Sequence, residues 1–285
     1  MVGVIGLIGA PQAAKAQSVP SFSVKITGNG PAMLLIPGLA SPGSTWDTTV
    51  QHFKSRFTCY VVTLAGFAGQ APIEGPFLPR VRDDLIAYLK SKQLSHVVVV
   101  GHSLGGTMAF WLAAQAPGLF SKVINVDGFP FFGALYTPEA TVESARPQGE
   151  QMKSLFAKQT QAEFAAGERQ TLKTMITAPS DIDRIFETSR KSDPKTVGTA
   201  MYELWTTDLR PDLANVHVPV LAIHTWIGYK QYGATHESVQ AMVKPQYAKL
   251  KDITVRISDR ARHFVMLDDP TWFFAQLDAF LTPKT

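Results

Sequence analysis

The sequence reads VVVVGHSLGG from Val97 to Gly106, and this stretch decides the fold. Four consecutive valines predict a short strand that is buried on both faces. The segment 107–116 that follows favours a helix, so the motif G-x-S-x-G stands in a turn between a strand and a helix. A turn this tight needs glycine on both sides of the serine, and it holds the hydroxyl out at the carboxyl end of the strand. We therefore predict that Ser103 is a nucleophile; the alternative is a glycine-rich turn with an idle serine.

Short β-branched runs recur on both sides of this motif and predict further strands. The predicted strands are Ser23–Ile26, Met33–Ile36, Tyr60–Leu64, Val97–Val100, Val123–Val126, Val220–Ile223 and Ile253–Ile257. Helical patterns stand between or after them at Pro79–Leu94, His236–Leu250 and Thr271–Leu281. Apolar strands that alternate with helices are typical of a mostly parallel sheet covered on both faces, so the predicted fold class is α/β.

This alternation is interrupted between residues 129 and 207, where no strand-like run occurs. The segments there that favour helices are Glu150–Ala166, Asp181–Lys191 and Pro194–Trp205. We predict an insertion of helices over residues 129–207, which either adds a packing layer or covers a pocket. Residues 17–128 and 208–285 then form a single sheet core.

Composition narrows the class of protein. The 285 residues are 45% hydrophobic and 18% charged with a net charge of +4, which excludes a disordered chain. The 27 basic and 23 acidic residues are spread without a basic block, so we expect no nucleic-acid partner. No apolar run reaches the roughly 20 residues that span a bilayer. The single cysteine, Cys59, excludes an internal disulfide and a cysteine-built metal site, and is expected to fill space in a strand.

The first residues, MVGVIGLIGAPQAAKA, have the pattern of a targeting segment. An apolar stretch at 2–10 is followed by Ala14-Lys15-Ala16, an A-x-A pattern like that before a signal-peptidase site. We predict a signal peptide over residues 1–16 and a secreted or periplasmic protein. No Lys or Arg precedes the apolar part, so the alternative is an apolar leader on a cytoplasmic protein.

After Ser21, nearly the whole chain resembles the α/β-hydrolase superfamily. Besides the serine turn, the resemblance rests on Ile36–Leu39 (IPGL), Ser44-x-Trp46 and Ala65–Gln70, where members often show D-x-P-G-x-G-x-S. It implies an α/β-hydrolase sheet flanked by helices, with a helical cap in the insertion. It also implies an oxyanion hole formed by the backbone N–H groups of Leu39 and Leu104. The alternative for Pro37–Leu39 is a plain turn that ends a strand.

His263 is the predicted base among seven histidines. It follows the last predicted strand and precedes the final helix, in the loop where superfamily members carry their histidine, usually as G-H-F; here Arg262 replaces the glycine. It stands 160 residues after Ser103, a chain order normal for this fold. We expect His102, beside the serine, to point away from it. The other histidines, on predicted helices or beside strands, are His52, His96, His217, His224 and His236.

The acid that orients the histidine has two known places in the superfamily. Many members carry it after the penultimate strand, but that alignment falls on Gly228, and no carboxylate follows before Glu237. The second place is the end of the strand after the serine helix, and there the sequence has Asp127. We predict Asp127, whose alternative role is to cap the next turn. Glu237, Asp208, Asp259 or no acid at all remain open.

Aromatic residues follow Asp127 and fill the loop that lacks the usual acid. We predict an apolar substrate pocket lined by Phe129, Phe131, Phe132, Trp226 and Tyr229; the alternative is that half of them form the core of the cap. The predicted function is cofactor-free hydrolysis of a small to medium, apolar carboxylic ester through a Ser-His-Asp triad and an acyl-enzyme, with no metal. The alternatives are C–C bond hydrolysis, cyanohydrin cleavage or perhydrolysis by the same triad, and a ligand-binding member without turnover.

Overall fold

The fold is built on one seven-stranded sheet, seen in a computed structural model that describes residues 20–135 and 137–282. The order is β1-β3-β2-β4-β5-β6-β7. Only β1 pairs antiparallel, with β3; the other pairs are parallel, which confirms the predicted α/β class. The strands are β1 (Phe22–Gly28), β2 (Ala32–Ile36), β3 (Thr58–Leu64), β4 (Val97–His102), β5 (Phe120–Val126), β6 (Val220–Thr225) and β7 (Ile253–Ser258). The predicted signal peptide, residues 1–16, lies outside the described residues.

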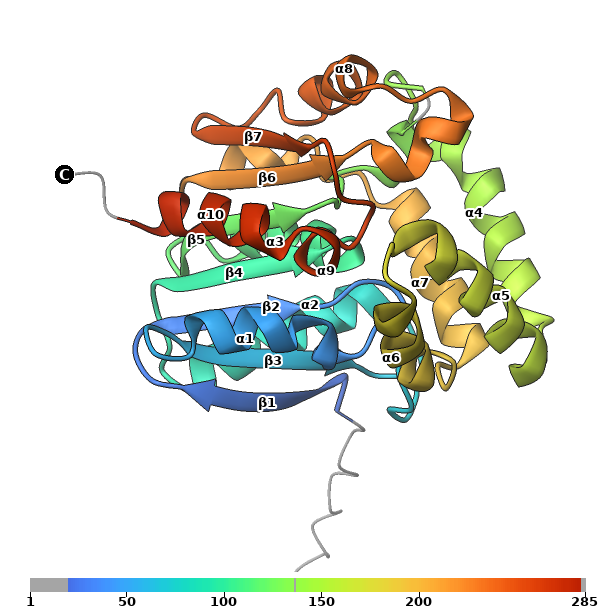
Figure 1. Ribbon diagram of the computed structural model, residues 1–285, viewed down its shortest axis with the longest axis horizontal. Helices are drawn as coiled ribbons and strands as arrows, with labels where there is room; N and C mark the ends of the chain where they lie inside the picture. Colours follow the sequence, from blue (N-terminus) through green and yellow to red (C-terminus); the bar gives the residue numbers. More distant parts are fainter. Residues whose placement is uncertain (1–19, 136, 283–285) are drawn as a thin grey trace, which may run out of the picture.

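Helices cover both faces of the sheet (Figure 1). One face carries α1 (Asp47–Phe53), α9 (Val265–Asp268) and α10 (Pro270–Leu281). The other carries α2 (Phe77–Ser91), α3 (Leu104–Gln115) and α8 (His236–Gln246). Short 3-10 turns η1 (Gly43–Trp46), η2 (Phe132–Ala134), η3 (Asp212–Asn215) and η4 (Ile227–Tyr232) complete the connections. None of the described helices is long and apolar enough to cross a membrane.

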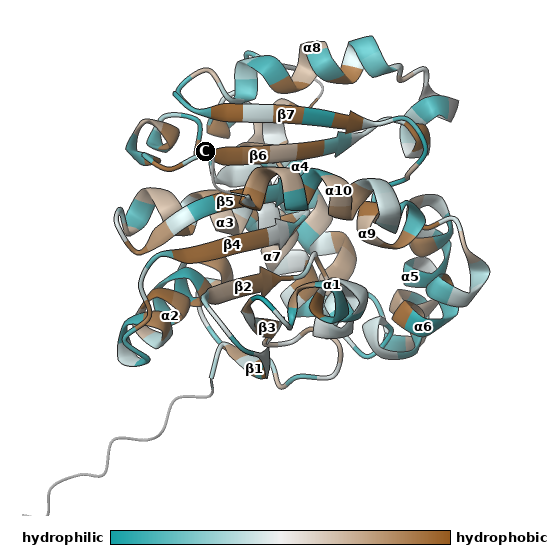
Figure 2. Cartoon of the chain, turned by 60° about the vertical axis from the view of Figure 1, so that its left-hand side comes forward, coloured by the Kyte–Doolittle hydropathy of each residue, from teal (hydrophilic) through white to brown (hydrophobic). Residues whose placement is uncertain are grey.

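The run of valines in β4 explains why the sheet is buried on both sides. Val97 and Val99 join the core under α2 and α3, whereas Val98 and Val100 join the core under α1 and α10. Each buried valine stabilises the fold by about 1.5 kcal/mol or more. The strands β2, β4 and β6 are accordingly drawn mostly in brown, the hydrophobic end of the scale (Figure 2). Cys59 is fully buried in β3, as predicted, and burial raises the pKa of its thiol to about 11.

Between β5 and β6, the described residues form four α-helices beyond the carboxyl ends of the parallel strands (Figure 1). They are α4 (Val142–Ala157), α5 (Gln161–Met175), α6 (Pro179–Ser189) and α7 (Pro194–Thr206). The prediction of a continuous helix over 150–166 is wrong, because α4 ends at Ala157 and α5 begins at Gln161. The Thr160 side chain accepts from the Glu163 N–H, and the Glu163 carboxylate accepts from the Thr160 N–H at 2.8 Å. This capping box starts a new helix at residue 161.

The start of α2 also differs from the prediction. The helix begins at Phe77, two residues before the expected Pro79, and ends at Ser91. The Glu203 carboxylate, which comes from α7, accepts from the backbone N–H groups of Phe77 (2.9 Å) and Leu78 (2.6 Å). An acceptor from 126 residues away in the chain thus caps this helix. The contact also ties the inserted helices to the sheet core.

Candidate active site

Ser103 occupies the sharp turn between β4 and α3. Its backbone has φ 54° and ψ −117°, a left-handed conformation that costs a non-glycine residue free energy. The neighbouring backbone is close: a side chain at Gly105 would collide with the carbonyls of Ile36 and Pro37. The Ser103 N–H donates to the Val126 carbonyl at 2.8 Å. This bond fixes the turn against the end of β5, where Asp127 follows.

Two backbone segments approach Ser103. Leu104 is the first residue of α3, so its N–H is one of those that a helix leaves without an intrahelical acceptor. On the other side passes the loop after β2: a Cβ at Gly38 would lie only 3.2 Å from the Ser103 Cβ. Leu39 is the next residue after Gly38, so its backbone also passes near Ser103. The Ser192 hydroxyl, which donates to the Ala40 carbonyl at 3.1 Å, holds this loop from the segment between α6 and α7.

Asp127 and His263 form a buried pair. The His263 Nδ1 and the Asp127 Oδ2 lie 2.6 Å apart, across 136 residues of chain. Asp127 is 4% exposed and His263 is 8% exposed. With its Nδ1–H donated to the carboxylate, the neutral imidazole keeps an unprotonated Nε2 that can accept a proton.

The environment of Asp127 keeps its side chain ionised. Burial by itself would raise the pKa of this carboxyl, but His224 and His263 outweigh burial and hold the pKa far below its usual range. Thr225 adds two donors, its N–H to Oδ1 at 3.2 Å and its hydroxyl to Oδ2 at 3.0 Å. Asp127 itself has a φ of 54°, which turns its side chain out of the strand direction. A fixed negative charge therefore stands behind the imidazole.

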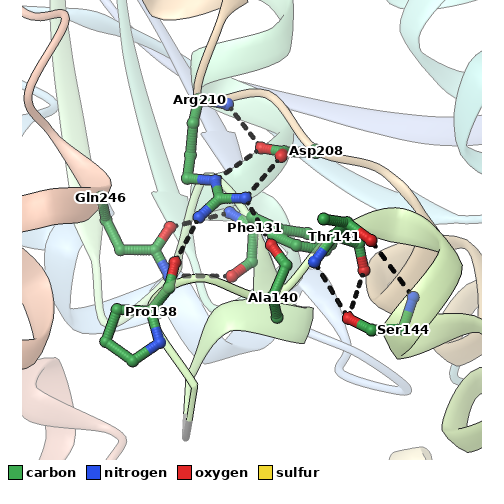
Figure 3. Close-up of polar contacts among 8 residues, drawn as sticks. All are labelled: Phe131, Pro138, Ala140, Thr141, Ser144, Asp208, Arg210 and Gln246. Carbon is green, nitrogen blue, oxygen red and sulfur yellow. Dashed lines mark hydrogen bonds and ion pairs between the residues drawn. The ribbon is translucent and has the colours of Figure 1, made fainter.

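The other carboxylates considered from the sequence are engaged elsewhere. Asp208 forms an ion pair with Arg210 at 2.7 Å, and Arg210 also donates to the carbonyls of Pro138 and Ala140 (Figure 3). Asp259 is exposed and accepts from the Trp226 indole and from His236, each at 2.8 Å. Glu237 lies exposed in the first turn of α8. Of the four candidates, the structure brings only Asp127 to His263.

His102 supports the histidine loop instead of contacting solvent. Its ring packs beside the His263 ring, with centroids 4.5 Å apart, and its Nε2 lies 3.1 Å from the His263 carbonyl oxygen. Complete burial, followed by the nearby His263, lowers the pKa of His102 well below its usual value. A neutral ring with its proton on Nε2 then donates to that carbonyl. Sequence reasoning missed this contact because it joins residues 161 positions apart.

The predicted pocket residues lie in different surroundings. Phe129 stacks at 5.0 Å from the His224 ring, next to Asp127. Phe131 is fully buried under the Arg210 guanidinium, and Gln246 binds both its N–H and its carbonyl (Figure 3), so it serves packing. Phe132 contacts Trp205 edge to face. The remaining two are in the segment after β6, where Trp226 binds Asp259 and Tyr229 is 40% exposed.

The described residues include no group of three or more His, Cys, Asp or Glu side chains placed to hold a metal ion. The strand ends bring Asp127 and His263 together, and the turn after β4 carries Ser103. A carboxylate, an imidazole and a hydroxyl are the groups that nucleophilic catalysis by serine uses.

The sequence and the fold match a known family. The model of the alpha/beta hydrolase family matches residues 33–276. The chain belongs to that family. Among curated alpha/beta hydrolase relatives, pimeloyl-[acyl-carrier protein] methyl ester esterase of Nitrosospira multiformis is 23% identical over 270 residues, covering 91% of this chain and 98% of the relative. The Nitrosomonas europaea protein of the same name is 27% identical over 213 residues, covering 72% and 80%.

Other relatives have other activities in their names. A 2-(acetamidomethylene)succinate hydrolase of Mesorhizobium japonicum is 25% identical over 258 residues, covering 86% of each chain. Among solved structures, the enol-lactonase of Burkholderia xenovorans matches with a TM-score of 0.73 at 19% identity, covering 92% of this chain and 96% of that one. This structure supports the alpha/beta hydrolase fold. The relatives named as methyl ester esterases agree with the expected class of enzyme, a carboxylic-ester hydrolase.

Proposed function

We propose that the protein hydrolyses small to medium, apolar carboxylic esters with Ser103 as nucleophile, His263 as base and Asp127 as the orienting acid. The observation that carries the proposal is the 2.6 Å pairing of Asp127 with His263 at the strand ends that also present Ser103. The curated relatives that act on a methyl ester support an ester with a short alcohol part.

The proposed reaction uses these groups in two halves. His263 Nε2 takes the proton of the Ser103 hydroxyl as its oxygen attacks the ester carbonyl carbon. The backbone N–H groups of Leu39 and Leu104 stabilise the oxyanion that forms. His263 then gives the proton to the departing alkoxide, which leaves as the alcohol. A water molecule, deprotonated by His263, cleaves the acyl-enzyme, releases the carboxylic acid and restores Ser103.

Asp127 acts in both halves of this reaction. Because its carboxyl stays ionised at neutral pH, it favours the tautomer that leaves Nε2 free and stabilises the imidazolium that forms in each transition state. Phe129 and Leu39 are the apolar side chains that we expect to border the acyl group. The helices α4–α7, at the same end of the sheet, would then serve as the cap over the substrate.

A panel of p-nitrophenyl esters from acetate to octanoate tests this function, together with a fluorophosphonate that labels nucleophilic serines. We expect turnover and a single covalent adduct by mass spectrometry, with both lost in Ser103→Ala. Ser91→Ala, at an exposed serine of α2, is the matched control and should retain both. Turnover that survives in Ser103→Ala contradicts the mechanism. A wild type that binds the esters without turnover supports a ligand-binding protein instead.

A further inference from the structure

A second chain of buried polar side chains continues behind Asp127, on the side away from His263. The His224 Nδ1 lies 3.4 Å from the Asp127 Oδ1, and the His224 Nε2 lies 2.7 Å from the Tyr247 hydroxyl. Asn125 Nδ2 approaches the same hydroxyl at 3.1 Å. Asn125 and His224 are fully buried and Tyr247 is nearly so. Asn125 and His224 come from β5 and β6, Tyr247 follows directly on α8, and the mechanism above uses none of them.

The directions of the hydrogen bonds in this chain are set by the backbone. Asn125 Oδ1 accepts from the Gly128 N–H at 3.0 Å, and Asn125 Nδ2 donates to the Gly128 carbonyl at 2.9 Å, which fixes the orientation of the amide. The Asn125 Nδ2 therefore donates to the Tyr247 oxygen. The Tyr247 proton goes to the nearer acceptor, His224 Nε2 at 2.7 Å, since the Gly128 carbonyl is 3.4 Å away.

This order determines where His224 carries its proton. An Nε2 that accepts from Tyr247 leaves the proton of the neutral ring on Nδ1, which faces the Asp127 Oδ1. At 3.4 Å this contact is long for a hydrogen bond. It still places the Nδ1–H dipole of His224 close to the buried negative charge of Asp127. His224 thus stands at one carboxylate oxygen of Asp127, and His263 at the other.

The sheet register places His224 there. Val126 pairs with Ile223 in the β5–β6 ladder, so Asp127 and His224 follow side by side at the strand ends. The Asp127 N–H donates to the Ile223 carbonyl at 2.7 Å and holds the two ends together. The end of β6 therefore supplies two groups beside the Asp127 carboxylate, the Thr225 donors and the His224 ring.

We propose that His224, held in its Nδ1–H tautomer by Tyr247, is a positioning residue that orients the Asp127 carboxylate and sets how strongly Asp127 stabilises a charged His263. This inference rests on the ester hydrolase proposed above. The titratable groups around Asp127 are His224, His263, His102 and Tyr247. Of these, His224 alone meets the Oδ1 atom and is absent from the proposed reaction steps.

The kinetic test compares His224→Leu, His224→Asn and Tyr247→Phe with wild type across pH. Removing the donor leaves more negative charge on Asp127, so a protonated His263 is favoured and the acidic limb of the kcat/KM profile moves to higher pH. In His224→Leu we expect kcat to fall about tenfold or more, the range typical of residues that orient a functional histidine. His224→Asn, whose amide nitrogen can replace Nδ1, restores part of kcat. Tyr247→Phe gives a smaller fall with the same direction of shift.

The control and the contrary results are defined in the same experiment. His217→Leu, at an exposed histidine, should leave both kcat and the pH profile unchanged. An unshifted acidic limb in folded His224→Leu overturns the proposal, whether or not kcat falls, because a merely structural defect lowers kcat equally at every pH. Should His224→Leu not fold, Tyr247→Phe decides by the same criterion.

A measurement without substrate separates this inference from the proposed function. Long-range ¹H–¹⁵N spectra of histidine-labelled protein report which ring nitrogen of each imidazole carries the proton, and comparison with His224→Asn assigns the His224 signals. We expect His224 to carry it on Nδ1 in wild type. A proton on Nε2 overturns the inference even if every ester is hydrolysed. If no ester is hydrolysed, the proposed function fails while the spectra still decide the tautomer.

Discussion

Asp127 is the residue on which the proposed site depends most. Its carboxylate is buried, accepts from His263 at 2.6 Å, and stands at the end of β5. Glu237 is exposed on α8, after β6, and Asp259, after β7, pairs with His236. The carboxylate that pairs with His263 therefore follows β5.

Replacing Asp127 by Asn is therefore expected to lower kcat by about 1,000- to 10,000-fold, because an amide at this position favours the wrong tautomer of His263. Glu237→Gln is the matched control and should retain full activity. The measurement is kcat on a p-nitrophenyl ester, with circular dichroism to verify folding. An Asp127→Asn variant that keeps most of its kcat would show that another group orients His263.

The turn at Gly105 shows how the elements constrain one another. This glycine is the second residue of α3, where the helix passes the end of β2, and a methyl group there would meet the Ile36 and Pro37 carbonyls. We expect Gly105→Ala to lower the free energy of unfolding by about 3 kcal/mol or more. Gly167→Ala in α5, where an added Cβ meets no atom within 4 Å, should instead stabilise by about 0.5 to 1 kcal/mol. Urea denaturation of both variants measures the difference; equal effects would contradict the close approach.

Glu168 gives α5 a dependence on pH. Burial raises the pKa of its carboxyl to about 7, against a smaller opposing effect of the Ser189 hydroxyl. Since the folded pKa lies above the unfolded value of about 4.3, the folded state binds the extra proton. The resulting stability is complete below about pH 4 and is lost as the pH rises to about 7.

We therefore expect Glu168→Gln to be more stable than wild type at pH 8 by about 1 to 3 kcal/mol, with the difference shrinking toward pH 5. The measurement is urea denaturation at the two pH values. The exposed Glu150→Gln serves as the control and should follow the wild type. If the free energy of unfolding of Glu168→Gln differed from that of wild type equally at both pH values, the carboxyl of Glu168 would be solvent-exposed and the prediction would be wrong.

Local patterns predict the elements better than they predict how those elements meet. The valines of β4, the serine turn and the order of strands and helices follow from runs of a few residues, and the structure confirms them. The start of α5 at residue 161 is also marked in the sequence, because T-x-x-E at Thr160–Glu163 is a capping signature. The prediction of one helix over 150–166 did not take this signature into account. The cap that Glu203 provides for α2 could not be predicted from the sequence, since no local pattern marks an acceptor 126 residues away.

The same holds for the candidate site. The sequence pointed to Ser103, Asp127 and His263 through motif and resemblance, and their catalytic roles stay predictions. The sequence analysis predicted only that His102 points away from Ser103, and it assigned no role to His224. The contacts of these two histidines depend on which strands are neighbours and on the register between the strands. The residues that flank a histidine in the sequence predict neither the strand order nor the register. Tyr247 lay in a segment recognised only as helical, where nothing marks a hydroxyl aimed at β6.

Over the whole molecule, the lone cysteine reports on the integrity of the sheet. Cys59 lies in β3, which is flanked by β1 and β2, and its thiol is fully buried with a pKa raised to about 11. A thiol reagent such as DTNB should not react in native buffer, and should react with one equivalent per chain over the same urea range as global unfolding. Reaction before the circular dichroism signal changes would mean that this edge of the sheet opens on its own.

The sheet order also has a consequence for how the protein is made. Ser103 and Asp127 stand before the four helices α4–α7 and His263 stands after them, on the loop that follows β7. During synthesis, β4 and β5 can pair long before β7 is available to dock on β6. A growing chain therefore carries Ser103 and Asp127 before His263 has been added. The proposed triad is complete only once the loop that follows β7 has been made.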